Sequence, residues 1–306
     1  MFGYTRQAYY DSRNRVEYRL LSGEVIINLV KEVRLDMPRM GAKKLHIKLT
    51  PKLCAMNINI GRDAFASLLS ENNMLIKRKR SRCRTTFSRH RFYKYPNLIR
   101  GLVPTAPNQL WVSDITYVAV GNGFIYLSLI TDAYSHKIVG WNLAQDLGAA
   151  NALKALKGAL KALPRGIAPI HHSDRGVQYC CDDYVSELEK YKLPISMTEN
   201  GDPLENAIAE RVNGILKTEW IYDAHFGSFA EAKTYVKRII GLYNSERPHQ
   251  SISYLTPNVV HNAEVNQIEE APQRKWKNYY PKRNAFANSA EFTTFELEGS
   301  LLQSTK

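Results

Sequence analysis

The sequence predicts a mixed α/β fold, a five-stranded sheet flanked by helices and preceded by a small helical region. Residues 109–120, 124–132 and 136–143 are rich in Ile, Val, Tyr and Trp and are separated by short turn sequences. This pattern predicts an antiparallel meander. Two further apolar runs, at 167–171 and 193–197, alternate with helical patterns. Strands that alternate with helices predict a sheet covered by helices on both faces.

The first part of the chain predicts three short helices. In residues 23–34 the apolar positions follow i, i+3, i+4, i+7 from Ile26, which is the period of an amphipathic helix. A second helix is predicted at 42–49, ending before Pro51, and a third at 62–70. Short helices with basic polar faces are typical of a helix-turn-helix, whose last helix enters a DNA groove. Many small helical bundles share this pattern.

Helical patterns and changes of composition complete the predicted organisation. Further helices are predicted at 149–163, 183–191, 204–220 and 228–243. We predict four parts: a helical DNA-binding region at 1–75, a basic linker at 76–106, a catalytic core at 107–262 and an irregular C-terminal tail at 263–306. The tail is polar, so we expect it to be loosely held unless a partner covers it.

The charge of the chain predicts an anionic partner. Lys and Arg number 42 against 29 Asp and Glu, a net charge of +13. Residues 77–100 hold ten Lys or Arg, and no acid occurs between Glu71 and Asp114. One interpretation is a solvated linker. Interleaved aromatic residues favour nucleic acid instead, because rings stack on bases while cations meet phosphates. We predict DNA contacts from the cations at the start of this stretch: Lys77, Arg78, Lys79, Arg80, Arg82 and Arg84.

Hydropathy and cysteine spacing exclude several classes of protein. No stretch has the apolar length of a membrane span, and the first residues lack the apolar centre of a signal peptide. The four cysteines show no CxxC spacing, so neither a zinc ribbon nor a disulfide framework is indicated. We expect a cytoplasmic protein.

Three carboxylates carry the strongest indication of chemistry. Asp114 lies within the strand predicted at 109–120, Asp174 follows an apolar run, and Glu210 lies in the helix predicted at 204–220. Asp114 shares a strand face with apolar residues, where a carboxylate is costly unless it is paired or metal-bound. Three such acids could hold a pair of Mg²⁺ ions, which bind oxygen ligands and substrate phosphates. Two metals can assist in-line phosphoryl transfer, so the acids point to cutting or joining of nucleic acid.

Other polar residues near these acids have simpler interpretations. His171 and His172 are adjacent in a strand and point to opposite faces, so at most one could join a site, and we interpret both as mainly structural. Asp132 stands where a strand meets a turn, a common place for Asp. Lys217 lies two turns after Glu210 on the same polar stripe, which also contains Asn206 and Asn213.

Five segments together resemble the DDE transposases of bacterial insertion sequences, in particular the second-frame product of the IS-three family. They are PNQLWVSDITYV, IVGWNL, HHSDRGVQY, GDPLENAIAERVNGILKTEW and YNSERPHQS. The resemblance implies an RNase H-like core similar to that of retroviral integrases, two Mg²⁺ or Mn²⁺ ions, and DNA cleavage followed by strand transfer. Asp114, Asp174 and Glu210 match the family's catalytic, metal-binding acids. Lys217 matches a basic position that contacts the transposon end, and we predict a DNA contact from Asn213 as well.

The resemblance also implies partners. These are double-stranded DNA from the element ends and the target, further copies of the chain that make at least a dimer on DNA, and an upstream-frame helical DNA-binding protein, to which family members are often fused by a ribosomal frameshift. In a bacterial cell such a protein would lie with the nucleoid. One departure from the family pattern is Glu199-Asn200, where many relatives carry a basic residue.

Two other functions stay open at this point. An RNase H-like nuclease would use similar acids but release free ends, which a joining assay would reveal. A non-enzymatic DNA-binding protein derived from a transposon would bind DNA without cutting it, and the intact set of three acids argues against this alternative.

Overall fold

The computed structural model describes residues 6–76, 91–121, 123–199 and 206–262. Within these residues one five-stranded sheet has the order β3-β2-β1-β4-β5. Its strands are β1 (Leu110–Val120), β2 (Gly123–Asp132), β3 (Ile138–Ala144), β4 (Ile170–Ser173) and β5 (Ile195–Met197). β1, β2 and β3 pair antiparallel, whereas β4 and β5 run parallel to β1. The predicted fold class, a mixed five-stranded sheet with helices, is confirmed.

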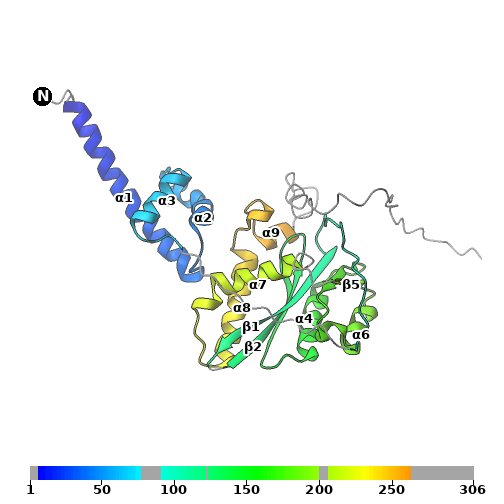
Figure 1. The fold of residues 1–306 in the computed structure, drawn as a ribbon. Helices are drawn as coiled ribbons and strands as arrows, with labels where there is room; N and C mark the ends of the chain where they lie inside the picture. The colour runs from blue at the N-terminus through cyan, green and yellow to red at the C-terminus, as the bar shows by residue number, and fades with distance from the viewer. Residues whose placement is uncertain (1–5, 77–90, 122, 200–205, 263–306) are drawn as a thin grey trace, which may run out of the picture.

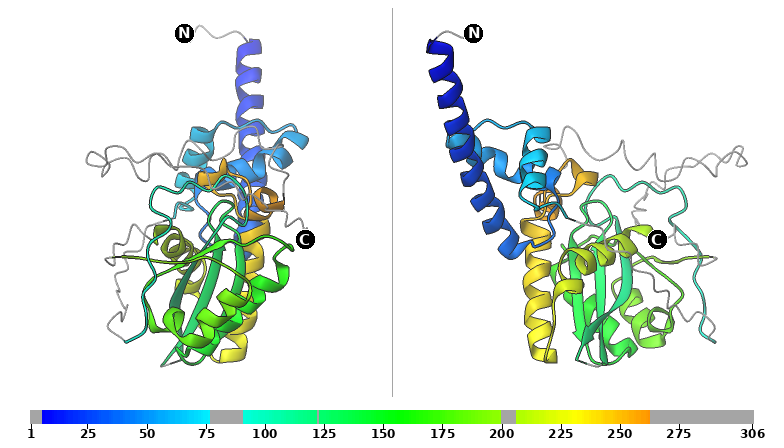
Figure 2. Two further views of the ribbon diagram at one scale, coloured as in Figure 1. Left: turned by 90° about the vertical axis from the view of Figure 1, so that its right-hand side faces the viewer. Right: turned by 60° about the vertical axis from the view of Figure 1, so that its left-hand side comes forward.

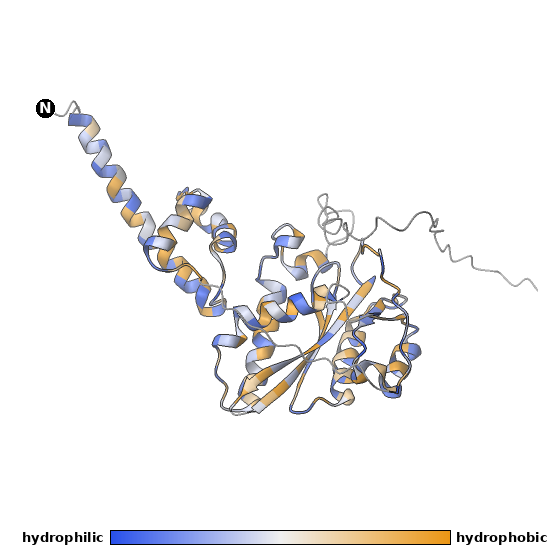
Figure 3. Ribbon diagram, viewed as in Figure 1, coloured by the Kyte–Doolittle hydropathy of each residue, from blue (hydrophilic) through white to orange (hydrophobic). Residues whose placement is uncertain are grey.

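Helices cover both faces of the sheet (Figure 1). One face carries α4 (Ala149–Ala162), α5 (Val177–Cys180) and α6 (Asp182–Lys190), and the other carries α7 (Ala207–Glu219) and α8 (Phe229–Ser245). The strands are largely apolar where they lie between these layers (Figure 3). Two short turns of helix, η1 (Ile221–Asp223) and η2 (Gln250–Ile252), precede and follow α8, and α9 (Pro257–Asn262) ends the described chain.

The N-terminal helices are longer than the sequence predicts. α1 runs from Arg6 to Asp36, α2 from Ala42 to Ala55 and α3 from Arg62 to Glu71. The prediction for α1 began at residue 23, because only its second half has a buried stripe. The first half extends away from the rest of the described chain (Figures 1 and 2). α2 continues through Pro51, because burial of Leu53 beside Leu49 offsets the cost of a proline inside a helix, about 3 kcal/mol.

Three other boundaries differ from the sequence prediction. β3 starts at Ile138 and not at residue 136, because His136 has a φ of 60° and belongs to the turn. β4 lies at Ile170–Ser173, later than the predicted 167–171, and the short helix α5 was not predicted. Boundaries predicted from sequence commonly differ by about 2–4 residues, which covers the two strand starts but not the missed helix. The helix starts at α6 and α8 are close to the prediction, and Ser228 caps α8 by accepting a hydrogen bond from the Glu231 amide.

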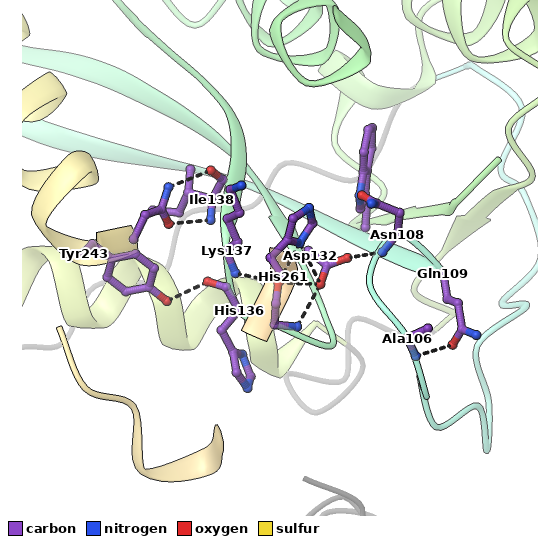
Figure 4. A network of polar contacts seen from close by, with 12 residues as sticks. Ala106, Asn108, Gln109, Asp132, His136, Lys137, Ile138, Tyr243 and His261 are labelled. Atoms are coloured by element: carbon purple, nitrogen blue, oxygen red, sulfur yellow. Dashed lines mark hydrogen bonds and ion pairs between the residues drawn. The ribbon is translucent and has the colours of Figure 1, made fainter. Parts of the chain in front are cut away.

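Asp132 organises the turn between β2 and β3 (Figure 4). Its side chain is fully buried and accepts hydrogen bonds from the Asn108 amide at 2.7 Å and the Ser135 amide at 2.8 Å. The Ser135 hydroxyl donates to the same carboxylate, and His261 of α9 lies 3.7 Å from it. These contacts explain an aspartate at this position through the backbone of the turn, as the sequence suggested.

The sheet approaches α4 most closely at Gly140 in β3. A Cβ atom added there would collide with the Ala155 carbonyl and lie 2.8 Å from the Ala159 Cβ. Only glycine fits between this strand and this helix without a shift of backbone atoms.

Gly140→Ala is therefore expected to lower the free energy of unfolding by about 1–3 kcal/mol, the usual cost of overpacking a core. The control is Gly158→Ala on the exposed side of the same helix, where the new Cβ meets nothing within 4 Å. That change should stabilise the helix by about 0.5–1 kcal/mol. Urea unfolding measures both, and equal effects of the two variants would contradict the close packing of β3 on α4.

The N-terminal helices dock on α7, η1 and α8. Trp220 is 1% exposed, and its indole NH donates to the Asp36 carbonyl at 2.7 Å. Apolar residues of α1, α2 and α3 join the same buried cluster as those of α7 and α8. Charged pairs surround this contact: Arg39 with Asp223, Lys44 with Glu219, Lys48 with Glu246 and Arg238 with Asp36.

Glu219, at the end of α7, lies at the centre of these charges. Two hydrogen bonds from the Arg247 guanidinium, at 2.6 and 2.7 Å, hold its carboxylate, and Lys44 contacts it at 3.1 Å. Burial opposes ionisation, but Arg247 and then Lys44 outweigh it and lower the pKa of Glu219 below its ordinary value of 4.5. A lowered carboxyl pKa adds stability above the unfolded-state pKa, and this stability is lost as the pH falls through the folded-state pKa.

Glu219→Gln is expected to lower the free energy of unfolding at pH 7 by about 3 kcal/mol, because it leaves the buried Arg247 without its anion. The gap between wild type and variant should start to narrow as the pH falls below 4.5 and should close as the pH falls through the lower folded-state pKa of Glu219, where the native wild-type carboxylate is protonated. Denaturant unfolding between pH 3 and pH 8 tests this. A gap that is constant over this range would show that the ion pair is not its cause.

Candidate active site

Asp114 lies in the middle of β1, the central strand, on the face that α7 covers. Its neighbours on this face, Val112 and Val118, are buried. Both carboxylate oxygens accept hydrogen bonds, one from the Ile115 amide at 2.9 Å and the other from the Asn213 side chain of α7 at 2.8 Å. The carboxylate is thus fixed in orientation from its own strand and from the helix above it.

Asp174 lies where β1 and β4 separate. The two parallel strands are in register up to the pair Val112 and His172, and Asp174 follows the end of β4. Its Oδ1 accepts the Gly176 amide at 2.9 Å, which shapes the turn into α5. The carboxyl end of parallel strands is where open α/β sheets bind ligands.

Glu210 comes from the first turn of α7 and is exposed. Its amide donates to the Asn206 carbonyl at 3.1 Å, the first hydrogen bond of the helix. The segment before it, 200–205, lies outside the described residues, so Glu210 stands close to where the described chain resumes.

Electrostatics connects the three acids. The pKa of Asp114 is raised to about 7, first by burial, then by Asp174 and, as the smallest effect, by Glu210, against the lowering by Asn213 and the Ile115 amide. Like charges act through space, so Asp174 and Glu210 lie within electrostatic range of Asp114. In the described part of the chain, no three His, Cys, Asp or Glu side chains are close enough to form a ready-made metal cluster. Carboxylate oxygens and crowded negative charge nevertheless suit a hard divalent cation.

The two histidines of β4, which precede Asp174, make hydrogen bonds with hydroxyl groups inside the protein. His171 Nε2 lies 2.7 Å from the Ser113 hydroxyl and 2.9 Å from the Tyr184 hydroxyl, and His172 Nδ1 lies 2.8 Å from the Ser196 hydroxyl. Both rings are buried. Burial, and then the neighbouring His172, lowers the pKa of His171 to about 3, so this ring is neutral at ordinary pH.

Asn213 and Lys217 follow Glu210 along α7. The Asn213 side chain is 4% exposed and donates to Asp114, so the structure gives it a partner inside the protein. The Lys217 ammonium lies 4.0 Å from the centre of the Tyr117 ring in β1, a cation–π contact. Phe124 packs edge-on against the same ring. The sequence pattern did not predict Tyr117 as a residue of this region. Its position on the same strand as Asp114 is the signal that could have indicated it.

The remaining predicted DNA contacts, Lys77, Arg78, Lys79, Arg80, Arg82 and Arg84, lie outside the described residues. Glu199, which stands where many relatives carry a basic residue, has an ion-pair partner in the structure. Arg100 contacts its carboxylate at 2.6 Å. The segment that carries Arg100 runs beside β5, where the Leu98 amide donates to the Ser196 hydroxyl at 2.9 Å.

Comparison with known proteins identifies the family of the chain. Two family models, each described as "Integrase core domain", match residues 104–203 and 191–257. The chain is 34% identical over 260 residues to the "Insertion element IS600 uncharacterized 31 kDa protein" of Shigella sonnei, covering 84% of this chain and 94% of the relative. It is 31% identical over 212 residues to "Transposase InsF for insertion sequence IS3A" of Escherichia coli (strain K12), covering 69% and 74%.

A solved structure with a similar arrangement is the HTLV-2 integrase catalytic core domain in complex with magnesium. It has a TM-score of 0.41 and 17% identity and covers 53% of this chain and 100% of that one. No helix in the described ranges is long and apolar enough to cross a membrane.

The sheet and the family models define a protein with an integrase core domain. Within that class, the chain belongs to the transposases of the IS3 (IS-three) family of insertion sequences.

The charge crowding at Asp114 leads to a stability prediction for the metal-free protein. Asp174→Asn keeps the oxygen that accepts the Gly176 amide but removes one negative charge near Asp114. We expect it to stabilise the metal-free chain by about 1 kcal/mol, roughly 2–4 °C in melting temperature for a domain of this size. The control is Asp146→Asn, because Asp146 makes the same turn contact to the Gly148 amide at 2.8 Å. Calorimetry in EDTA that gives the two variants equal melting temperatures would contradict the crowding.

Proposed function

We propose that this transposase cleaves the ends of its insertion sequence and joins them to DNA by metal-dependent phosphoryl transfer, with Asp114, Asp174 and Glu210 as the catalytic, metal-binding acids. The observation that supports the proposal is the placement of Asp114 on β1 against Asn213 of α7 and of Asp174 after the end of β4, together with the raised pKa of Asp114, to which Asp174 and Glu210 both contribute. Membership of the IS3 family supports the same reaction.

Mg²⁺ or Mn²⁺, two ions per site, is the proposed cofactor. When bound, such ions lower the pKa of an attacking water or 3′-hydroxyl and stabilise the departing 3′-oxygen. The protein's own residues supply the ligands and their orientation. Asp114 is held by Asn213 and the Ile115 amide, and Asp174 by the Gly176 amide. Glu210 stands exposed at the rim, open to the DNA backbone.

Lys217 is the proposed contact to the element end. Its ammonium lies over the Tyr117 ring of β1, and the residue stands two turns after Glu210 on α7, so a DNA phosphate that approaches the acids would be within reach of it. Asn213 is better supported as a positioning residue for Asp114 than as a direct DNA contact, because it is buried and already donates to that carboxylate.

The proposed partners are double-stranded DNA, at least one further copy of the chain and an upstream-frame helical protein, all in the bacterial cytoplasm. The helical region at 1–75 and the linker at 76–106 are the proposed additional DNA-binding parts of the chain. In α2, Lys44 and Lys48 contact Glu219 and Glu246 of the core, so DNA contacts from this region would use other side chains.

Asp114→Asn, Asp174→Asn and Glu210→Gln are each expected to reduce Mg²⁺-dependent cleavage and joining to the background of the assay. DNA affinity should change by less than about tenfold, or ~1.4 kcal/mol. The measurement uses a labelled duplex of the element end with a plasmid target, and Asp183→Asn at the start of α6 is the control. Activity retained by all three variants would refute the assignment. Cleavage without joined product in wild type would favour the plain nuclease.

Lys217→Ala is expected to weaken binding and joining of the specific end and to reduce the slope of log binding constant against log salt by about 0.9, the loss of one phosphate contact. Lys161→Ala is the matched control, because Lys161 also lies in the last turn of a helix but on the other side of the sheet. Salt titrations of end-DNA binding test both variants. Identical slopes for the two would show that Lys217 is a solvated lysine.

A further inference from the structure

A gap opens between β1 and β4 beside the acids, and one side chain closes it. The carbonyl of Gln109 in front of β1 accepts the Ile170 amide at 2.9 Å, so the odd-numbered carbonyls of this stretch face β4. The strand register ends at Val112 and His172. The next carbonyl that faces β4 belongs to Ser113, and it accepts a hydrogen bond from the Asn206 side chain at 3.1 Å.

Asn206 uses its side chain in an unusual way for its position. It is the N-cap residue of α7, where an asparagine normally accepts an amide of its own helix through the side-chain oxygen. Here the side chain makes no capping hydrogen bond and donates its amide group to β1 instead. The residue is only 5% exposed, and its Oδ1 is buried without a hydrogen-bond partner in the described structure. An unsatisfied buried atom costs stability, so the fold retains this arrangement at a cost.

A second asparagine repeats the contact two turns later. Asn206 donates to the carbonyl of Ser113, and Asn213 donates to the carboxylate of the next residue, Asp114. The two side chains lie on one face of α7, and both contact β1. One contact alone would let the helix pivot, whereas two fix its rotation and its position along the strand. Glu210 lies between them in the sequence, in the first turn of α7, and its amide donates to the Asn206 carbonyl.

We propose that Asn206 is a positioning residue of the active site: it closes the gap between β1 and β4 and sets the start of α7, and therefore Glu210, at the height of Asp114. This inference rests on the proposed function, because it assigns Asn206 a role toward the acids that would hold the metal. Without its contact, α7 stays attached through Asn213 and its apolar stripe, but its first turn moves relative to β1.

The test uses the full-length chain and Mn²⁺ as a probe. Asn206→Leu and Asn206→Ala both remove the donor, the first with similar volume. Mn²⁺ binding is measured by electron paramagnetic resonance without DNA, together with the melting temperature, the affinity for end DNA and the rate of a single cleavage turnover. The matched control is Asn151→Leu, another buried asparagine at a helix start, which donates to Asp146 on the opposite face of the sheet.

We expect both Asn206 variants to fold and to bind Mn²⁺ about 10–100-fold more weakly than wild type, as is usual for groups that orient metal ligands. The cleavage rate should fall by a similar factor, DNA affinity should stay within about twofold of wild type, and Asn151→Leu should leave Mn²⁺ affinity unchanged. Wild-type Mn²⁺ affinity in both folded variants would overturn the inference. So would loss of cooperative unfolding in both, because Asn206 would then be needed for the fold as a whole.

The same data separate this inference from the proposed function. A wild-type chain that binds Mn²⁺ but cuts no DNA would refute the function and leave Asn206 to be judged by Mn²⁺ affinity. An active wild type with active, tightly binding Asn206 variants would refute only the role of Asn206.

Discussion

A carboxylate held within the central strand is the constraint on which the rest of the structure depends. Asp114 interrupts a row of buried apolar side chains on β1, and burial together with two other acids favours its neutral form. A core tolerates such a group only when its oxygens are hydrogen-bonded. At Asp114 the Ile115 amide and the Asn213 side chain of α7 meet this need. The position of α7 on β1 is therefore linked to the hydrogen bonds of one carboxylate.

The two halves of the sheet differ in how they are held. The Asp132 turn and the close packing of Gly140 on α4 stabilise the antiparallel half, β1 to β3. The parallel half is short, and the separation of β4 from β1 provides the position of Asp174. Rigid strands therefore hold one acid, a tight turn holds the second, and a helix start holds the third. Backbone amides contact the carboxylates of Asp114 and Asp174, and Glu210 is exposed in the first turn of α7.

Much of this architecture could be predicted from sequence, because strand and helix periods in the core are strong. The prediction failed where tertiary contacts outweigh local preference. Pro51 does not end α2, since Leu53 is buried, and the first half of α1 has no buried stripe from which to predict it. The three acids and Lys217 were proposed from their spacing and from the family resemblance, but the partners of Asn206 and Asn213 could not be predicted. Spacing along one helix shows which residues share a face, and it cannot show which of them meets another strand.

The helix that carries Glu210 also carries the surface on which the N-terminal helices dock. Glu210 is in the first turn of α7, while Glu219 and Trp220 at its end contact Lys44 and Asp36. A helix of 13 residues is about 20 Å long and stiff. Glu210 at its start and the docking surface at its end therefore belong to one stiff element. A displacement of the N-terminal helices that tilts α7 would also displace Glu210.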